Sequence, residues 1–201
     1  MDDRYVRAER LRARDRQRHQ RCVAELLHAA GLHAPRVLEQ DLERGFLLLG
    51  DLGSRLYLQE LQAAVAAGDR RTADRLMRDA IAALVQWQVR ADARGLPPYD
   101  EALLQRELAL FPDWCVAREY RREWTDDQRG RWQAVTALLV HSALAQPSVA
   151  VHRDYMPRNL MVSEPNPGVL DFQDAVEGPI TYDILSLYKD AFRSWPEEFV
   201  R

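Results

Sequence analysis

Two short motifs in the last third of this 201-residue chain restrict its possible folds more than any other feature. The first is His152-Arg153-Asp154-Tyr155-Met156-Pro157-Arg158-Asn159, in which an amide follows an acid by five places. The second is Asp171-Phe172-Gln173-Asp174. Short apolar runs at 149–151, 159–162 and 168–172, broken by turn residues, predict small strands that frame a loop. We therefore expect a fold that brings the acid, the amide and Asp171 together.

The residue types in these motifs suit phosphoryl transfer. Asp154 is the candidate base, because the reaction needs one carboxylate beside the incoming hydroxyl. Asn159 and Asp171 are the candidate Mg²⁺ ligands, since Mg²⁺ prefers oxygen ligands and takes few protein carboxylates. An ordinary turn residue is the alternative for each ligand. The order and spacing of the whole set are more specific than any single part.

Three neighbouring residues are expected to support the loop. His152 is predicted to pack and hydrogen-bond rather than to transfer protons. Arg153 has two open interpretations, a partner for a carboxylate or phosphate and a plain salt bridge. Asp183 opens a helix in Thr181-Tyr182-Asp183-Ile184, where an acid favours the helix dipole. Its carboxylate is also predicted to accept backbone N–H bonds from the catalytic loop.

Composition indicates a globular protein with hydrophobic content of 47% and charged content of 29%. Residues 1–21 hold eight arginines and four acids, a net charge of +4. Because the whole chain carries −3, residues 22–201 carry −7. That total predicts no nucleic-acid partner, and no apolar run predicts a signal peptide or a membrane span. Cys22 and Cys115 are expected to be two reduced thiols. These features together predict a cytoplasmic location.

The first quarter of the chain is predicted to hold a helix and a hairpin. Residues 3–30 are expected to be one helix that ends at Gly31, with Val23, Leu26, Leu27 and Ala30 as its apolar stripe. The charged first part, residues 1–21, has little to bury, which also favours disorder. Strands are predicted at 35–40 and 45–49, joined by a turn at 41–44.

Most of the remaining chain is predicted to be helical, with an α+β fold class overall. A long helix at 69–93 is expected to bury Ala80, Ala83, Leu84, Trp87 and Val89. The helix that begins at residue 101 is expected to stop at Pro112. Thr125 and Gln128 form a capping-box pattern at the start of another helix. The predicted helices are 54–67, 69–93, 101–110, 125–145 and 181–189.

These motifs resemble the aminoglycoside phosphotransferase and choline kinase superfamily. The form Asp171-Phe172-Gln173-Asp174-Ala175, then Gly178-Pro179 and Thr181-Tyr182-Asp183, resembles in particular its cell-wall sugar kinases. Those kinases phosphorylate N-acetylmuramate or N-acetylglucosamine at the anomeric hydroxyl. The likeness covers roughly residues 22–195. It includes the segments Gly31 to Leu38, Gly45 to Gly53, Tyr99-Asp100-Glu101, Arg106-Glu107-Leu108, Leu110-Phe111-Pro112 and Trp114.

The resemblance implies a protein-kinase-like fold with a mostly helical C-terminal lobe and a remnant of the N-terminal sheet lobe. Residues 1–52 would hold the remnant and the hinge, and residues 53–201 an incomplete catalytic lobe. ATP would bind with its adenine at the hinge, near Leu49, Gly50 and Asp51, and Mg²⁺ would be the metal. The resemblance also implies that Glu107 and Trp114 lie near the sugar. The alternatives are that Glu107 is an ordinary helix acid and that Trp114 is a core anchor.

The chain departs from this family at the phosphate clamp. Such kinases use a glycine-containing loop and a basic strand residue on the phosphates. This chain has no glycine before Gly31, and Lys189 is its only lysine. We therefore expect a kinase shortened at both ends. Three functions stay open: a sugar phosphotransferase, a non-catalytic fragment or interaction module, and a kinase for aminoglycosides or amino alcohols. The two kinase hypotheses imply a small-molecule acceptor, and the non-catalytic one implies none. The sequence leaves the oligomeric state open.

Overall fold

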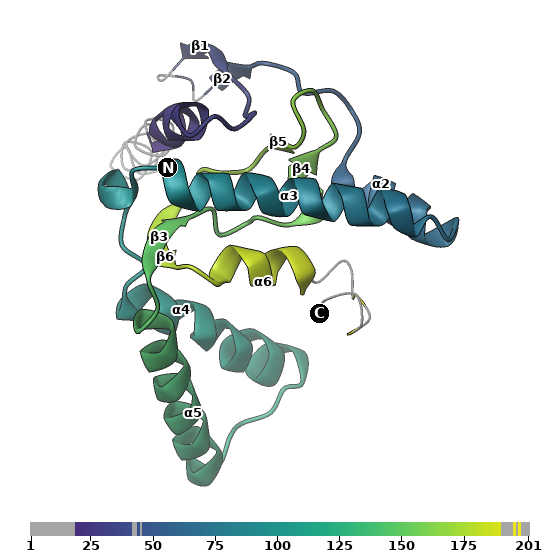
Figure 1. Cartoon of the computed structure of the whole chain (residues 1–201). Helices are drawn as coiled ribbons and strands as arrows, with labels where there is room; N and C mark the ends of the chain where they lie inside the picture. The colour runs from purple at the N-terminus through teal and green to yellow at the C-terminus, as the bar shows by residue number, and fades with distance from the viewer. Residues whose placement is uncertain (1–18, 42–43, 45, 190–194, 196, 198–201) are drawn as a thin grey trace.

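The computed structural model describes residues 19–41, 44, 46–189, 195 and 197. Helix α3 runs through the middle of the molecule (Figure 1). The N-terminal helix and a β-hairpin lie on one side of it, and α6 with a helical arm lies on the other. Within the described ranges, no helix is both long enough and apolar enough to cross a bilayer.

The N-terminal part follows the predicted helix and hairpin. Residues 19–29 are helical, and Gly31 follows them at φ +83°, a left-handed conformation that glycine adopts without strain. The predicted residues 3–18 lie outside the described part of the chain. Strands β1 (Val37–Asp41) and β2 (Phe46–Leu49) pair antiparallel, with Val37 opposite Leu49. The predicted hairpin is therefore confirmed.

Helices α2 (Tyr57–Ala66) and α3 (Arg70–Arg90) confirm the next two predictions. Asp69 caps α3 by accepting a hydrogen bond from the Thr72 N–H, and a short 3₁₀ turn at Ala93–Gly95 follows the helix. The predicted buried position of Val89 is wrong, because its side chain is 77% exposed. Val89 follows the buried Trp87 by two places, which rotates it about 200° around the helix to the opposite face.

Three further helical elements form the arm, which we define as α4 (Glu101–Leu110), η2 (Phe111–Glu119) and α5 (Asp126–Leu144). The predicted bounds of the α-helix, 101–110, are confirmed, but Pro112 does not end the helical path, which continues as a π-helix in η2. Leu110 and Phe111 both keep right-handed helical backbones, so the missing N–H of Pro112 falls where the α-helix changes to the wider π-helix. The predicted capping box of Thr125 and Gln128 is confirmed at the start of α5.

Small antiparallel pairs hold the two motifs. Strand β3 (Ser148–Val151) pairs with β6 (Val176–Pro179), and β4 (Leu160–Met161) pairs with β5 (Gly168–Val169). The 3₁₀ turn η3 (Pro157–Asn159) leads into β4, and α6 (Tyr182–Tyr188) follows β6. Strand β6 was not predicted, because glycine and proline make Val-Glu-Gly-Pro look like a turn.

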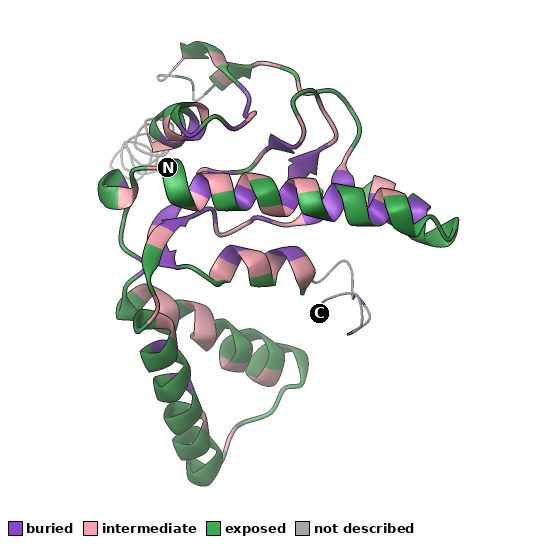
Figure 2. Ribbon diagram, viewed as in Figure 1, coloured by how far each residue is buried: buried purple, intermediate pink, exposed green. Residues whose placement is uncertain are grey.

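One hydrophobic core joins the N-terminal helix, α2, α3, the small strands and α6. Buried colour in Figure 2 concentrates on these elements, whereas the arm is mostly exposed or intermediate. Val23 and Leu27 share this core with Leu84 and Trp87. The core thus spans the predicted lobe boundary after residue 52, which itself stays a prediction.

Candidate active site

The β4–β5 pair places the two candidate metal ligands side by side. Leu160 pairs with Val169, and the Leu170 N–H donates to the Asn159 carbonyl at 2.9 Å. Asn159 therefore stands at the start of one strand, and Asp171 follows the end of its neighbour. The paired strands bring together residues separated by twelve positions in the sequence.

Asp154 faces this pair from the preceding loop. The side-chain NH₂ of Asn159 donates to the backbone carbonyl of Asp154 at 2.9 Å. The side-chain oxygen of Asn159, Oδ1, is thereby left for another partner. Burial raises the pKa of the Asp154 carboxyl, and the negative charges of Asp171 and Asp174 raise it further. Asp154 thus lies within reach of two further negative charges, beside the Asn159 amide. A hard divalent cation fits this donor set and would relieve the repulsion.

Two residues of the site have left-handed backbones. Arg153 has φ of 73°, and Asp171 has φ of 60°. Aspartate tolerates this conformation better than most residues, but a long side chain such as arginine adopts it at a cost. Strain of this kind persists only where surrounding contacts hold the residue in place. The chain next to Asp154 is therefore held by contacts from elsewhere.

Asp183 provides one such contact from the start of α6. Its carboxylate accepts the His152 N–H at 2.7 Å and the Arg153 N–H at 3.0 Å, as predicted. The side chain is fully buried, and burial raises the pKa of Asp183 to about 7. The two N–H donors oppose that rise, and the charge of Asp154 adds to it.

His152 is buried beneath the loop and packs edge-on against Tyr155 at 5.6 Å between ring centroids. Burial lowers the pKa of the imidazole to about 4, although the nearby Leu170 carbonyl and Asp171 charge oppose this shift. The predicted packing role is confirmed. The predicted hydrogen bonding of the ring stays a prediction: neither nitrogen has a partner in good geometry among the described residues, yet the Leu170 carbonyl is near enough to act on the imidazole. A neutral imidazole fits the apolar space that it fills.

The Arg153 side chain reaches α4. Its Nη2 donates to Glu107 Oε1 in a half-buried ion pair, and its Nη1 donates to the Asp174 carbonyl at 3.4 Å. The hydroxyl of Tyr99 donates to Glu107 Oε2, and that of Tyr182 lies 3.4 Å from the same oxygen. Arg153 therefore pairs with a carboxylate in a salt bridge, and its pairing with a phosphate stays a prediction.

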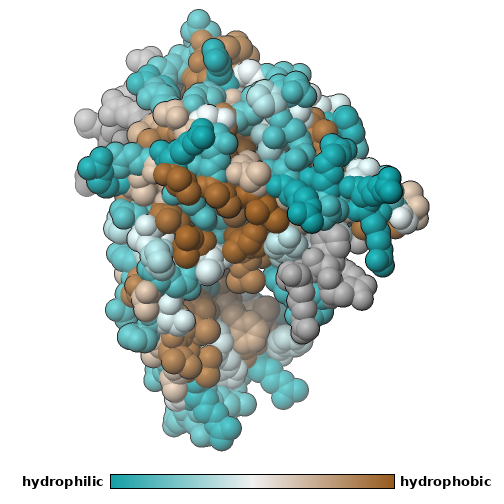
Figure 3. Space-filling view, in the orientation of Figure 1, coloured by the Kyte–Doolittle hydropathy of each residue, from teal (hydrophilic) through white to brown (hydrophobic). Residues whose placement is uncertain are grey.

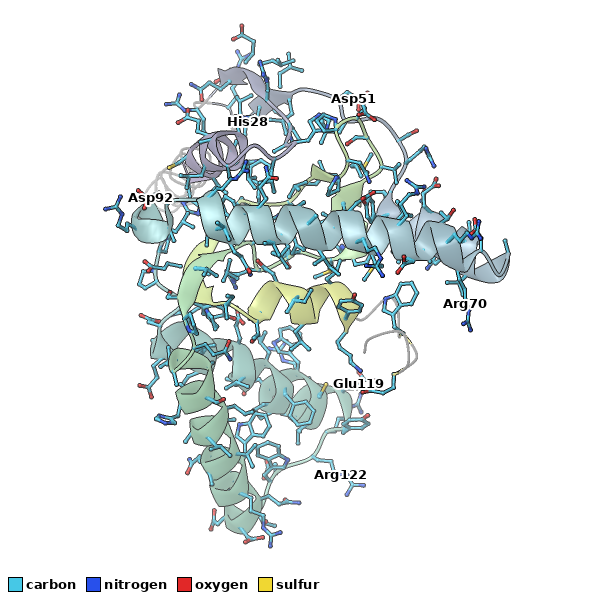
Figure 4. All side chains as sticks on the ribbon, viewed as in Figure 1. His28, Asp51, Arg70, Asp92, Glu119 and Arg122 are labelled. Atoms are coloured by element: carbon cyan, nitrogen blue, oxygen red, sulfur yellow. The ribbon has the colours of Figure 1, made fainter. Side chains whose placement is uncertain are left out.

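The predicted hinge borders a pocket of about 380 Å³. One wall is the turn after β2, and Met161 of β4 with Leu170, which follows β5, forms the other. Figure 4 shows Asp51 on this turn, at the outer edge of the molecule. The pocket is lined by Pro35, Leu49, Gly50, Asp51, Leu52, Gly53, Ser54, Leu56, Met161 and Leu170. Its mixture of apolar side chains and turn backbone suits a flat heteroaromatic ring.

The structure gathers most predicted site residues and separates one. Asp154, Asn159 and Asp171 meet, with His152, Arg153 and Asp183 behind them. Trp114 lies on η2 and is 55% exposed, with the Arg118 guanidinium 4.1 Å from its ring centroid. The expectation of a core anchor is therefore wrong, because the π-helix turns Trp114 outward from the core.

Sequence reasoning gave no role to three residues of the site. Asp174 lies within the second motif, so its proximity to Asp171 was a usable signal. Tyr99 and Tyr182 lie 83 places apart and stack edge-on at 5.2 Å between centroids. No sequence signal joins them, because their contact depends on how α4 and α6 pack.

The chain belongs to the phosphotransferase enzyme family, whose sequence pattern matches residues 3–201. It is 58% identical over 176 residues to an N-acetylmuramate/N-acetylglucosamine kinase of Pseudomonas aeruginosa, covering 87% of this chain and 50% of that protein. Another protein with this name, from Neisseria meningitidis, is 46% identical over 170 residues, covering 84% of this chain and 50% of that protein. The chain thus spans about half the length of these curated relatives.

The fold resembles solved aminoglycoside phosphotransferases. One of type APH(2'')-Ib, in an ADP-bound crystal structure, superposes with a TM-score of 0.66 at 17% identity, over 93% of this chain and 64% of that one. Another, of type APH(2'')-IIa, was solved as a streptomycin–ATP ternary complex and has a TM-score of 0.65 at 17% identity, over 94% and 64% of the two chains. The predicted kinase-like α+β fold is confirmed.

Proposed function

We propose that this chain carries the catalytic residues of an ATP-dependent phosphotransferase that acts on a hydroxyl of an N-acetylated amino sugar. The observation that carries the proposal is the meeting of Asp154, from the loop after β3, with Asn159 and Asp171, which flank β4 and β5. The names of the relatives support the acceptor class. The cytoplasmic location is part of the same proposal.

Each residue of the site has a distinct task in this proposal. Asp154 accepts the proton of the acceptor hydroxyl, and its raised pKa brings the carboxyl closer to a useful range for proton transfer. Asn159 and Asp171 would hold Mg²⁺, which supplies positive charge against the phosphate oxygens when bound. Asp183 holds the loop that carries Asp154 through two backbone hydrogen bonds. The pocket beside Leu49 and Asp51 receives adenine.

A second candidate is a non-catalytic member of the family. The observation that favours it is the absence of a lysine other than Lys189 for the phosphates. Lys189 follows α6 and lies 3.9 Å from Glu197, so it is engaged away from the β2 hinge. A kinase for aminoglycosides is a third candidate, favoured by the fold likeness alone.

Phosphate transfer to defined acceptors separates these candidates. The full chain is incubated with Mg²⁺ and ATP together with N-acetylglucosamine, N-acetylmuramate or an aminoglycoside, and the phosphorylated product is detected by mass spectrometry. We expect product from an amino sugar, reduced by about 10²-fold or more in Asp154→Ala. Transfer to the aminoglycoside alone contradicts the acceptor class. No transfer to any acceptor favours the non-catalytic candidate.

A further inference from the structure

We propose that Glu107 is a positioning residue that fixes Arg153, and through it the loop at Asp154, with Tyr99 and Tyr182 as its partners. The expected effect of Glu107 on catalysis rests on the proposed function. The expected effect of Glu107 on the order of the loop does not. Glu107 comes from α4, outside both sequence motifs.

Both oxygens of Glu107 are engaged by the protein itself. Oε1 accepts from Arg153, and Oε2 accepts from Tyr99, with the Tyr182 hydroxyl at 3.4 Å. Burial raises the pKa of both tyrosines, so their hydroxyls remain protonated donors. Each oxygen thus already accepts from the protein, and the Glu107 side chain is only 28% exposed, which restricts the access of a sugar hydroxyl. Glu107 is thus better suited to hold Arg153 than to bind the acceptor.

The ion pair lies where it can control the loop. The side chains of Arg153 and Glu107 are only 23% and 28% exposed, so water and salt screen their attraction less than at the surface. The guanidinium also lies 5.7 Å from the centroid of the Tyr99 ring. Asp183 holds the backbone N–H of Arg153, and Glu107 holds its other end. Together they oppose relaxation of the left-handed Arg153 backbone, which adjoins Asp154.

The four residues come from separate segments of the chain. Tyr99 precedes α4 and packs on Gly178 of β6, where an added Cβ would approach the Tyr99 Cβ to 2.8 Å. Tyr182 begins α6, Glu107 lies on α4, and Arg153 lies in the loop after β3. A change at Glu107 should therefore reach the loop directly, without loosening the core around α3.

Amide hydrogen exchange of the full chain tests this inference without ATP or acceptor. The matched variants are Glu107→Gln and Glu101→Gln, which remove one charge each from the same helix; Glu101 is exposed in its first turn. We expect Glu107→Gln to speed exchange at the His152 and Arg153 amides by about 10- to 100-fold, the loss of a charged hydrogen bond. Exchange in α3 should not change, and Glu101→Gln should have no effect.

Three results would overturn the inference: unchanged exchange at these amides, an equal increase in α3, or the same increase in Glu101→Gln. A double-mutant cycle with Arg153→Gln adds a check, because two residues acting through each other give non-additive effects. Additive effects would also contradict it.

Kinetics give a second readout where the chain transfers phosphate. Glu107→Gln should lower kcat with KM for the acceptor unchanged, since Glu107 orders the loop and does not touch the sugar. A raised KM with unchanged kcat would mean that Glu107 contacts the acceptor, and the inference would fail. If Glu107→Gln speeds exchange at the loop amides but the chain transfers no phosphate, the proposed function is contradicted and the inference about Glu107 still holds.

Discussion

The loop at 152–159 and the arm show opposite relations between residue polarity and burial. The loop region buries His152 and Asp183 almost completely, whereas the arm leaves Phe111, Trp114 and Leu138 at least half exposed. Figure 3 shows the apolar surface that gathers over α5 on this face. Asp183 is buried because two loop N–H groups satisfy its carboxylate. For Asp183, specific hydrogen-bond partners therefore allow a charged group to be buried.

The comparison also separates two kinds of aromatic packing. Trp87 is fully buried in the core, whereas the arm's aromatic rings pack on one another near the surface. Phe111 stacks on Trp132 at 5.4 Å between centroids, and Trp124 lies 5.4 Å from Trp132. In Figure 4, Glu119 and Arg122 mark the part of the arm where η2 ends, close to these rings. The arm thus has a local cluster, and Glu107 connects it to the loop.

The largest expected effect compares one tryptophan from each region. Trp87→Ala should lower the free energy of unfolding by about 3–5 kcal/mol, because it empties a large space in a packed core. Trp114→Ala should lower it by less than about 1 kcal/mol, since that ring is 55% exposed. Urea unfolding followed by circular dichroism measures both. Equal losses would show that the arm is as tightly packed as the core.

The next effect concerns the pH dependence of stability at Asp183. Its pKa is about 7 in the folded chain against an ordinary 3.8, so the folded state binds the proton more tightly. This contribution to stability is complete below about pH 4 and is lost as the pH rises to about 7. Relative to Asp183→Asn, the wild type should lose roughly 2–4 kcal/mol over that interval.

Urea unfolding at a series of pH values measures the difference between the wild type and Asp183→Asn. Using the difference cancels the other carboxylates, some of which have lowered pKa values and the opposite pH dependence. A difference that stays constant between pH 4 and 7 would argue against a buried, poorly solvated Asp183.

The smallest effect compares two glycines. Gly178 lies in β6, where an added Cβ would meet the Tyr99 ring at 3.0 Å, so Gly178→Ala should destabilise by about 1–3 kcal/mol. Gly130 lies inside α5 with open space around it, so Gly130→Ala should stabilise by about 0.5–1 kcal/mol. Thermal unfolding measures both variants. The same sign of change in both would contradict the contrast between the two regions.

The sequence predicted the parts of this molecule that local chemistry determines. Thr125 with Gln128 and the left-handed Gly31 were visible as helix-end signals, and the motif spacing predicted that Asn159 and Asp171 would meet. Pairing of β6 with β3 was not visible, because it joins residues 25 to 31 positions apart through a glycine–proline strand. The Glu107–Arg153 pair was also missed, since only the packing of α4 brings the two residues together.

Mg²⁺-dependent ATP binding tests the central claim most directly. Isothermal titration of the full chain with ATP, with and without Mg²⁺, is compared with Asp171→Asn, which keeps the side-chain shape and tolerates the left-handed backbone. Asp113→Asn, an exposed acid of the arm, is the charge-matched control. We expect Mg²⁺-dependent binding that Asp171→Asn weakens by about tenfold or more and Asp113→Asn leaves unchanged. Absence of binding at millimolar ATP, or equal Mg²⁺ dependence in Asp171→Asn, would contradict the account.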